Sequence, residues 1–193
     1  MAADKRGLRK EILRARRFLP ASYRQEASRA ILSRLYELAS YQQASSVMAY
    51  ASMQDEVQLE ELLSHSLAQS KIVGLPYVIE KGVMGAVKLP DMASLTEGAY
   101  GILTVAKEKR ELLPPGSFDL VLVPGVAFAE DGSRLGMGAG FYDRFLCEVE
   151  PQARRIALCF DCQLAADIPM EKHDQRVEAI ITETRFIDCR REY

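Results

Sequence analysis

Apolar residues recur along this chain in two alternating patterns. In the first pattern they are spaced three or four positions apart, which is typical of an amphipathic helix. In the second they form short continuous runs, which are typical of strands buried on both faces of a sheet. We predict helices over 5–19, from Ser22 to Leu38, from Asp55 to Leu67 and over 141–150, and strands over 46–52, 71–76, 119–123, 155–160 and, as the last strand, 177–182.

Several residues mark where these helices begin or end. Pro20 has no backbone N–H to donate, so it ends the first helix. Ser22, with Gln25 three positions later, resembles a capping box that opens the second helix. Asp55 and Glu56 suit the positive N-terminal end of the third helix, where a carboxylate is favourable.

The middle of the chain has a weaker pattern. Apolar residues at 78–79 and 83–89 flank Lys81 and Gly82, which indicates a β-hairpin. The segment 90–115 has no clean period, so we expect a loop with one short element there. Strands and helices otherwise alternate, which predicts an α/β fold whose mostly parallel sheet is covered on both faces. No repeat or linker interrupts the pattern, and we expect a single domain over 1–193.

Basic residues are concentrated near the N-terminus, although the net charge of the chain is only −2. Seven lysines and arginines lie between Lys5 and Arg17, against one acid, Glu11. Such a stretch can receive an anion, or it can be the solvated face of a helix. The nearly balanced total gives no argument for binding to nucleic acid or to an anionic membrane.

Composition also bears on the compartment. No apolar run approaches the length of a membrane span, and the N-terminus lacks a signal-peptide core. A chain of 193 residues that is 48% hydrophobic needs no disulfides, so we expect a reducing cytoplasm. Among the four cysteines, Cys159 and Cys162 form a lone CxxC, which could be a redox pair or half of a zinc site. Because no second CxxC is present and Cys159 ends an apolar run, we favour a structural role.

The densest chemical signal is the segment 134–146, which contains glycines at 136, 138 and 140 before a predicted helix. Glycines let the backbone adopt positive φ and approach a ligand closely, and free amides at a helix start favour phosphate. The spacing is neither that of a Walker loop nor that of a dinucleotide fingerprint. A tight strand-to-helix turn would explain the glycines equally well. Arg134 beside them favours the phosphate interpretation.

Two acids could accompany such a loop. Asp143 lies in the first turn of the predicted helix, where it could also simply complement the helix dipole. Asp174 lies in a polar loop before the last strand, and as an isolated residue it would be an ordinary surface acid. Two carboxylates near phosphate oxygens suit Mg²⁺. With only His65 and His173 and no Gly-x-Ser-x-Gly motif, the sequence shows no nucleophilic triad.

These motifs together resemble the 5-formyltetrahydrofolate cyclo-ligase family, whose signature runs Arg-Leu-Gly-x-Gly-x-Gly-Tyr-Tyr-Asp. The similarity covers nearly the whole chain. The stretch 5–9 is similar to the family's basic N-terminal motif, 52–57 to its substrate-side motif, and 119–128 to the strand before the glycine loop. The segment 157–183 follows its C-terminal pattern.

The resemblance implies a three-layer α/β/α sandwich like those of sugar-phosphate isomerases and CoA transferases, and it implies a set of site residues. Arg134 and Lys5 would be catalytic, and Asp143 and Asp174 would hold Mg²⁺. The folate would lie against Ala51, Met53, Glu56, Phe141 and Tyr142. ATP would lie against Lys5, Arg6, Gly7, Leu8, Arg9, Arg134, Leu135, Gly136, Met137, Gly138, Ala139, Gly140, Phe141 and Tyr142.

The implied reaction converts 5-formyltetrahydrofolate, which can carry a polyglutamate tail, to 5,10-methenyltetrahydrofolate with release of ADP and phosphate. ATP would phosphorylate the formyl oxygen to an iminium phosphate, which the anilino nitrogen of the same substrate then attacks. Because the nucleophile belongs to the substrate, positioning and charge would be the enzyme's contribution. The resemblance implies a monomer or weak dimer.

Some positions depart from the family pattern: Tyr77, Ala139, Phe141 and the pair Thr104 and Val105. Tyr77 and the pair concern the hold on the glutamate end of a folate. One alternative is therefore a non-catalytic folate- or nucleotide-binding module on the same scaffold. A phosphosugar isomerase of similar fold is a further alternative, and the basic N-terminal motif argues against it.

Overall fold

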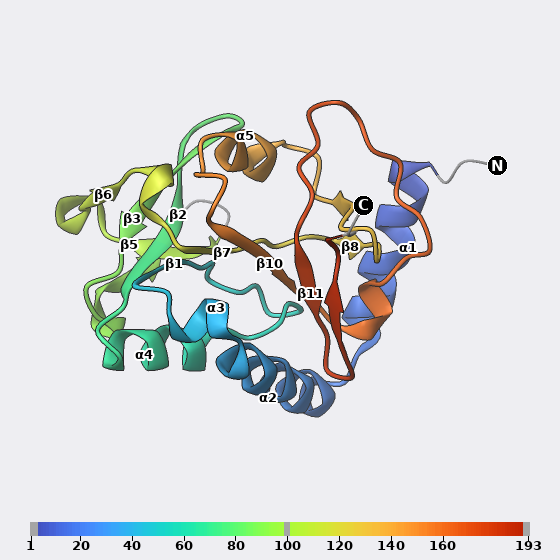
Figure 1. Cartoon of the computed structure of the whole chain (residues 1–193), viewed down its shortest axis with the longest axis horizontal. Helices are drawn as coiled ribbons and strands as arrows, with labels where there is room; N and C mark the ends of the chain where they lie inside the picture. Colours follow the sequence, from blue (N-terminus) through green and yellow to red (C-terminus); the bar gives the residue numbers. More distant parts are fainter. Residues whose placement is uncertain (1–3, 99–100, 191–193) are drawn as a thin grey trace.

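The computed structural model describes residues 4–98 and 101–190, and its centre is an eight-stranded sheet in the order β12-β11-β10-β7-β1-β2-β3-β6 (Figure 1). The strands from β11 to β2 in this order run parallel, whereas the pairs β12–β11, β2–β3 and β3–β6 are antiparallel. The strands are β1 (Ser46–Met48), β2 (Ile72–Glu80), β3 (Val83–Lys88), β6 (Leu112–Leu113), β7 (Leu120–Leu122), β10 (Arg154–Leu158), β11 (Ala179–Ile181) and β12 (Phe186–Asp188).

Helices cover both faces of this sheet (Figure 1). On one face lie α2 (Ala21–Glu37), α3 (Ala39–Gln42) and α4 (Glu60–Ala68), and on the other lies α5 (Phe141–Cys147). A further helix, α1 (Lys5–Phe18), packs at one side of the molecule against the hairpin of β8 (Ala127–Phe128) and β9 (Arg134–Leu135). The three-layer α/β/α prediction is confirmed.

The central strands show why short apolar runs form this sheet. Leu120 and Leu122 of β7 are buried in the cluster under α2 to α4, whereas Val121 between them is buried in the cluster under α5. Neighbouring side chains of a strand point to opposite faces, so a continuous apolar run supplies both layers at once. Ile156 and Ala157 of β10 divide between the two clusters in the same way.

The strand order reverses direction between β1 and β7. From β1 the chain continues to β2 on one side, and from β7 it continues to β10 and β11 on the other. In open α/β sheets a crevice forms outside the carboxyl ends of the two strands at such a point, and ligands bind there. The segments that leave these carboxyl ends begin at Ala49 after β1 and at Val123 after β7.

Several predicted elements are corrected by the structure. The third helix begins at Glu60, because Glu56 accepts the backbone N–H of Met53 and closes a turn instead. The second helix begins at Ala21, directly after Pro20, so the expected Ser22–Gln25 capping box is not formed. The helix predicted over 141–150 ends at Cys147.

The segment 90–115 is more regular than expected. It contains the short helices η1 (Met92–Ser94) and η3 (Lys107–Lys109), the hairpin of β4 (Leu95–Glu97) and β5 (Leu103–Val105), and β6. These strands of two or three residues are too short to show an alternating pattern. The predicted strand over 177–182 is followed by β12, so it is not the last strand. Two further short helices are η4 (Pro115–Ser117), before β7, and η5 (Asp161–Gln163), after β10.

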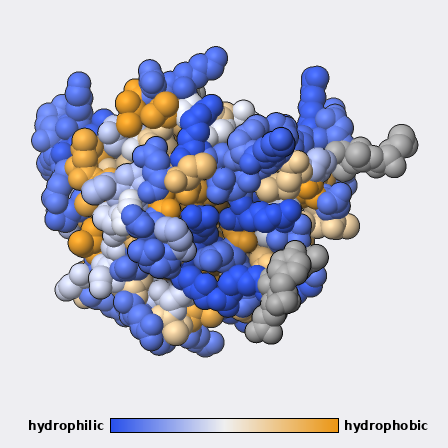
Figure 2. Space-filling view, turned by 45° about the horizontal axis from the view of Figure 1, so that its top comes forward, coloured by the Kyte–Doolittle hydropathy of each residue, from blue (hydrophilic) through white to orange (hydrophobic). Residues whose placement is uncertain are grey.

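The surface agrees with the balanced composition. On the face shown in Figure 2 hydrophilic residues predominate, and hydrophobic residues form separate small groups. Within residues 4–98 and 101–190, no helix is both long and apolar enough to cross a membrane.

Candidate active site

Two loops lie close to the start of α1, the loop between β9 and α5 and the loop before β11 that contains Asp174. The first loop joins β9 to α5 and contains the three glycines. Gly138 and Gly140 have φ of 99° and 71°, so the predicted need for glycine holds at these two positions. Arg144 donates from Nη1 to the carbonyls of Ala139 at 3.0 Å and Gly82 at 2.7 Å, which ties this loop to the β2–β3 hairpin.

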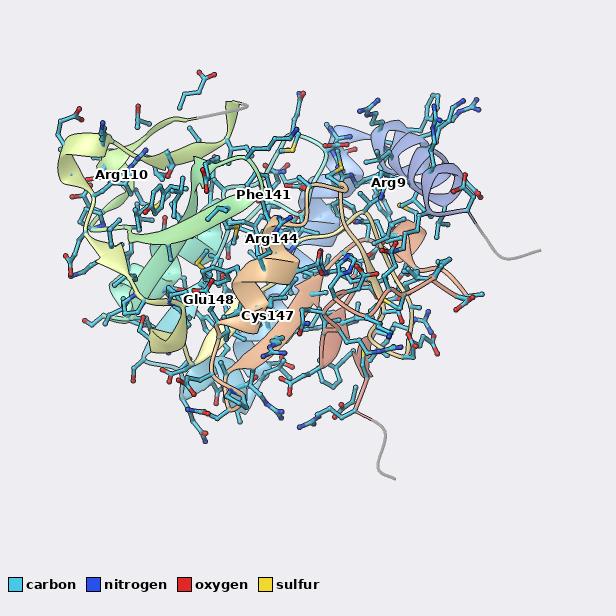
Figure 3. The ribbon with its side chains drawn as sticks, turned by 90° about the horizontal axis from the view of Figure 1, so that it is seen from above. Arg9, Arg110, Phe141, Arg144, Cys147 and Glu148 are labelled. Carbon is cyan, nitrogen blue, oxygen red and sulfur yellow. The ribbon has the colours of Figure 1, made fainter. Side chains whose placement is uncertain are left out.

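Helix α1 places two cations against this loop region. Lys5 and Arg9 are four positions apart, so they share one face of the helix. Arg9 donates from Nε to the carbonyl of Gly136 at 2.9 Å, and Figure 3 shows Arg9 on α1 and Phe141 at the start of α5. Leu8 packs in the apolar cluster that contains Ile12, and it therefore anchors the helix. Asp4 caps α1 by accepting the N–H of Arg6.

Not all residues of the basic motif face this region. Arg6 and Gly7 are exposed, and Gly7 lies on the outer side of α1 with Lys10 and Arg14. Leu135 is buried in the cluster beneath the loop. The structure therefore brings Arg9 to the glycine loop and Lys5 to the loop of Asp174. The contacts of Leu8 and Leu135 give these two residues a packing role.

Arg134 and Asp143 form a short ion pair across the ends of the loop. Their Nη2 and Oδ1 atoms are 2.5 Å apart, and the side chain of Arg134 is only 4% exposed. The same Oδ1 accepts the backbone N–H of Gln175 at 3.1 Å. Nε of Arg134 is buried and has no hydrogen-bond partner within the described residues. An unpaired guanidinium donor in a buried position favours a site that receives an anion.

Asp174 is held in a second cation–carboxylate group. Its Oδ2 lies 2.7 Å from Nζ of Lys5 and accepts the backbone N–H of Glu171. Burial alone would raise the pKa of Asp174, but these hydrogen bonds outweigh burial and hold the pKa below its usual value. Lys5 also contacts Glu171 at 3.0 Å. Asp174 is therefore an ionised carboxylate in an ordered loop.

The two expected metal ligands thus lie on connected segments. Asp143 contacts the backbone of Gln175, the neighbour of Asp174. Over the described ranges there is no group of three or more His, Cys, Asp or Glu side chains that could hold a metal ion. Mg²⁺ commonly uses only one or two protein carboxylates and completes its shell with phosphate oxygens and water. The pair fits such a metal in the presence of phosphate.

Glu56 lies in the turn that follows β1, beside Arg16 of α1. Its Oε2 accepts the N–H of Met53 at 2.9 Å. Burial raises the pKa of Glu56, and the backbone bond from Met53 and the charge of Arg16 only partly offset this. The buried phenols of Tyr50 and Tyr142 both have pKa values raised by burial first and by the charge of Glu56 second.

The surroundings of Glu56 also contain an unpaired polar atom. The Oη of Tyr142 is buried and has no partner within residues 4–98 and 101–190. A cavity of about 10 Å³, roughly the space of one water molecule, is lined by Arg16, Tyr50, Glu56, Val57, Pro124, Gly125, Leu158 and Gln163. It lies where the segments after β1 and β7 meet, which is the position that the strand order predicts.

The remaining expected contact residues differ in exposure. Met53 and Met137 are exposed apolar side chains, at 45% and 66%, which leaves them free to contact a ligand. Ala139 is exposed, Phe141 is half-buried and Ala51 is buried.

Sequence reasoning missed two residues of this region. Arg16 belongs to the basic N-terminal stretch, yet it is buried. Its position four residues after buried Ile12 is the signal that could have identified it. Gln163 is also buried and donates from Nε2 to the carbonyls of Gly125 and Val126, which fixes the segment after β7. Gln163 is one of the residues by which the segment 157–183 resembles the family's C-terminal pattern, but the resemblance gave it no role in the site.

Three of the five positions that depart from the family pattern, Tyr77, Thr104 and Val105, lie close to one another. Thr104 of β5 donates from Oγ1 to the carbonyl of Pro76 at 3.2 Å. Tyr77, the next residue of β2, lies with its ring centroid 5.1 Å from the guanidinium carbon of Arg110. Val105 is fully buried. Arg110 contacts both Tyr77 and the carbonyl of Val105, so a basic side chain lies beside these positions.

The cysteines take no part in the site geometry. Cys159 is fully buried, and burial raises the pKa of its thiol well above the usual value. All four cysteines belong to the described ranges, and all four are free thiols. A buried neutral thiol is unreactive, which agrees with the structural role that we favoured.

The fold and the site together describe an α/β protein with a glycine loop beside the buried Arg134 and a nearby carboxylate pair, and comparison with known proteins identifies its relatives. The model of the 5-formyltetrahydrofolate cyclo-ligase family matches residues 1–183. A mouse protein named 5-formyltetrahydrofolate cyclo-ligase is 33% identical in an alignment of 191 residues that covers 93% of each chain. A Mycolicibacterium smegmatis protein of the same name is also 33% identical, with 95% of this chain and 96% of that one covered.

A solved structure gives the same result. The NMR structure of 5,10-methenyltetrahydrofolate synthetase from Aquifex aeolicus matches with a TM-score of 0.87 and 30% identity, covering 98% of this chain and 94% of that chain. The protein is an enzyme of the ligase class. The chain belongs to the 5-formyltetrahydrofolate cyclo-ligase family.

Proposed function

We propose that this enzyme converts 5-formyltetrahydrofolate to 5,10-methenyltetrahydrofolate. ATP would be the co-substrate and Mg²⁺ the cofactor, and ADP and phosphate would be released. Family membership supports the reaction, and one observation of the site supports the use of ATP and metal. Lys5 pairs with Asp174, and Arg134 pairs with Asp143, in two adjacent cation–carboxylate groups. If phosphates and Mg²⁺ bind together, each cation can pair with phosphate and each carboxylate with the metal, so that no charge is left unpaired.

In this exchange, Arg134 and Lys5 would turn from the carboxylates to the phosphate oxygens, and Asp143 and Asp174 would be free to hold the metal. Mg²⁺ would neutralise charge on the phosphates. Gly138 and Gly140 allow the backbone of the loop to approach the phosphates. Arg9, already bonded to the carbonyl of Gly136, holds the loop in place.

The covalent steps need no nucleophile from the protein. The formyl oxygen on N5 of the substrate attacks the γ-phosphorus of ATP, and ADP leaves. The N10 nitrogen then attacks the formyl carbon of this iminium phosphate, loses its proton, and expels phosphate to form the methenyl bridge. The site contributes alignment, which in ideal intramolecular models is equivalent to roughly 7–11 kcal/mol, and it stabilises the charge that develops.

Residues around the crevice would bind the folate. We propose that Glu56 accepts hydrogen bonds from the donor groups of the pterin, and that the ring of Phe141 and the Met53 side chain contact its apolar parts. The unpaired Oη of Tyr142 is a further polar group available to the substrate. The free thiols agree with function in a reducing cytoplasm. We extend the proposal to folates with a polyglutamate tail and to a monomer or weak dimer.

The test is a direct assay of the product. Purified protein is mixed with 5-formyltetrahydrofolate, ATP and Mg²⁺, and the absorbance of 5,10-methenyltetrahydrofolate is followed together with phosphate release. We expect equal amounts of both products, and neither when any reactant is omitted. Folate and ATP binding without either product would overturn the proposal and support a non-catalytic binding module.

A further inference from the structure

Arg16 is a buried charge whose presence packing alone does not explain. Its side chain is 4% exposed, whereas that of Arg17 is 72% exposed. Ile12 and Arg16 are the buried residues of α1, four positions apart on the same face. An apolar residue at position 16 would continue this face without the cost of removing a charge from water.

The guanidinium of Arg16 faces the turn after β1 with all three of its nitrogens. Nε and Nη2 each lie 3.1 Å from Oδ2 of Asp55, and Nη1 lies 3.6 Å from Oε1 of Glu56. A planar guanidinium holds its donors in fixed directions toward two carboxylates, whereas the donors of a lysine ammonium rotate at the end of a flexible stem. Arg16 thus connects α1 to the two consecutive acids of this turn.

The position of this contact gives it a consequence for the site. Arg16, Glu56 and Tyr50 line the small cavity at the crevice, and Met53 fixes the other oxygen of Glu56. We propose that Arg16 is a positioning residue that holds the Glu56 carboxylate in one orientation for the folate, and so joins the helix of the ATP-side cations to the folate side. This inference rests on the proposed function of Glu56.

The charges around Glu56 support the same role. Burial is the largest cause of its raised pKa, and the neighbouring charge of Asp55 acts in the same direction. Arg16 lowers the pKa of Glu56 and so favours the carboxylate. The phenols of Tyr50 and Tyr142, which also face Glu56, carry raised pKa values and stay neutral. Loss of Arg16 should therefore both loosen Glu56 and shift its ionisation to higher pH.

The experiment compares Arg16→Met, Arg16→Lys and the control Arg14→Met. Arg14 is exposed on the same helix and takes no part in the proposed site. We expect Arg16→Met to raise KM for 5-formyltetrahydrofolate about tenfold while KM for ATP changes less than about twofold, since one charged contact to a buried group is lost. The acidic limb of the kcat/KM profile should move to higher pH. Arg14→Met should leave both KM values unchanged.

A double-mutant cycle tests whether Arg16 acts through Glu56. In a Glu56→Gln background, Arg16→Met should change folate affinity less than about twofold, because the group that Arg16 orients is already absent. Direct binding of 5-formyltetrahydrofolate without ATP gives this readout independently of turnover. Equal losses in both backgrounds would show that Arg16 does not act through Glu56, and would overturn the inference.

Arg16→Lys covers the case in which Arg16→Met does not fold, because lysine keeps the positive charge opposite Asp55. We expect it to fold and to raise the folate KM about fivefold, since the two-carboxylate geometry is lost. A folded Arg16→Lys with the wild-type folate KM and pH profile would refute the positioning role. Absence of turnover in the wild type would instead count against the proposed function, while the binding cycle still decides the role of Arg16.

Discussion

The carboxylate of Glu56 lies in a turn between β1 and α4, one oxygen bonded to the N–H of Met53 and the other near Arg16. Complementing a helix dipole, the alternative role that its sequence position suggested, is excluded because α4 begins only at Glu60. A structural role in closing the turn remains. Glutamine retains an acceptor for the turn but offers a ligand's donors a weaker partner than a carboxylate does.

The first prediction follows from this difference. Glu56→Gln should keep its Tm and its ATP affinity but lose about 1–3 kcal/mol of folate affinity, because donors of the bound folate lose a charged acceptor. Calorimetry with 5-formyltetrahydrofolate and with ATP measures both affinities. A variant that melts early yet binds folate normally would assign Glu56 to the turn alone.

A second prediction concerns the contact of Arg134 with ATP. Because its buried guanidinium has an unpaired Nε in the described part of the chain, we expect it to contact phosphate. Arg134→Ala should weaken ATP binding by about 1.5–3 kcal/mol. Circular dichroism controls for folding, since the variant also leaves Asp143 without its ion pair. Unchanged ATP affinity in a folded variant would remove Arg134 from the site.

Among the elements, those with strong periodicity were predictable and those defined by tertiary contacts were not. The central strands and α1 follow directly from their apolar patterns. The start of α4 was placed too early because Arg16, which is distant in sequence, pairs with Asp55 and stabilises a turn there. The site followed a similar rule: motif residues such as Arg134 and Asp174 were assigned to it from the sequence, whereas the role of Gln163, also a motif residue, is recognised only by its contacts.

The metal prediction concerns two aspartates on different segments, Asp143 in the first turn of α5 and Asp174 in the loop before β11. Asp143→Asn and Asp174→Asn should each raise the Mg²⁺ concentration for half-maximal activity by at least about tenfold, since a ligand contributes no less than the residues that orient it. Folate binding without metal should stay nearly unchanged. Glu148→Gln, an exposed residue just after α5, is the matched control. A wild-type Mg²⁺ titration for either aspartate variant would show that this residue is not a ligand.

Ion pairs between distant segments contribute to the response of the whole molecule to acid. Asp131, in the β8–β9 turn, pairs with Arg176 before β11. Burial opposes ionisation of Asp131, but the bonds from Arg176 and Ser133 outweigh burial and lower its pKa from 3.8 to about 2. Asp174, paired with Lys5, also has a lowered pKa. A lowered folded-state pKa stabilises the protein above the unfolded pKa, and this stability is lost as pH falls.

The acid prediction concerns this window. The free energy of unfolding should fall as pH decreases from about 4 to about 2. Asp131→Asn should show a shallower fall, because position 131 then no longer binds more protons in the unfolded state than in the folded state. Glu56, whose pKa is raised, contributes in the opposite direction and above this window. Urea unfolding at a series of pH values measures the slope. Asp167→Asn, at an exposed position, is the control, and equal slopes in the Asp131 variant and wild type would contradict the prediction.

The contacts of α1 also determine the order in which the enzyme becomes complete during synthesis. Lys5 and Arg9 leave the ribosome well before their partners, Asp174 and Gly136. Since synthesis proceeds at roughly 5–20 residues per second, the first helix waits on the order of ten seconds for the loops that complete it. During that time Lys5 lacks both of the acids that it finally meets, Glu171 and Asp174. The nascent chain can build much of its sheet before it can hold a nucleotide.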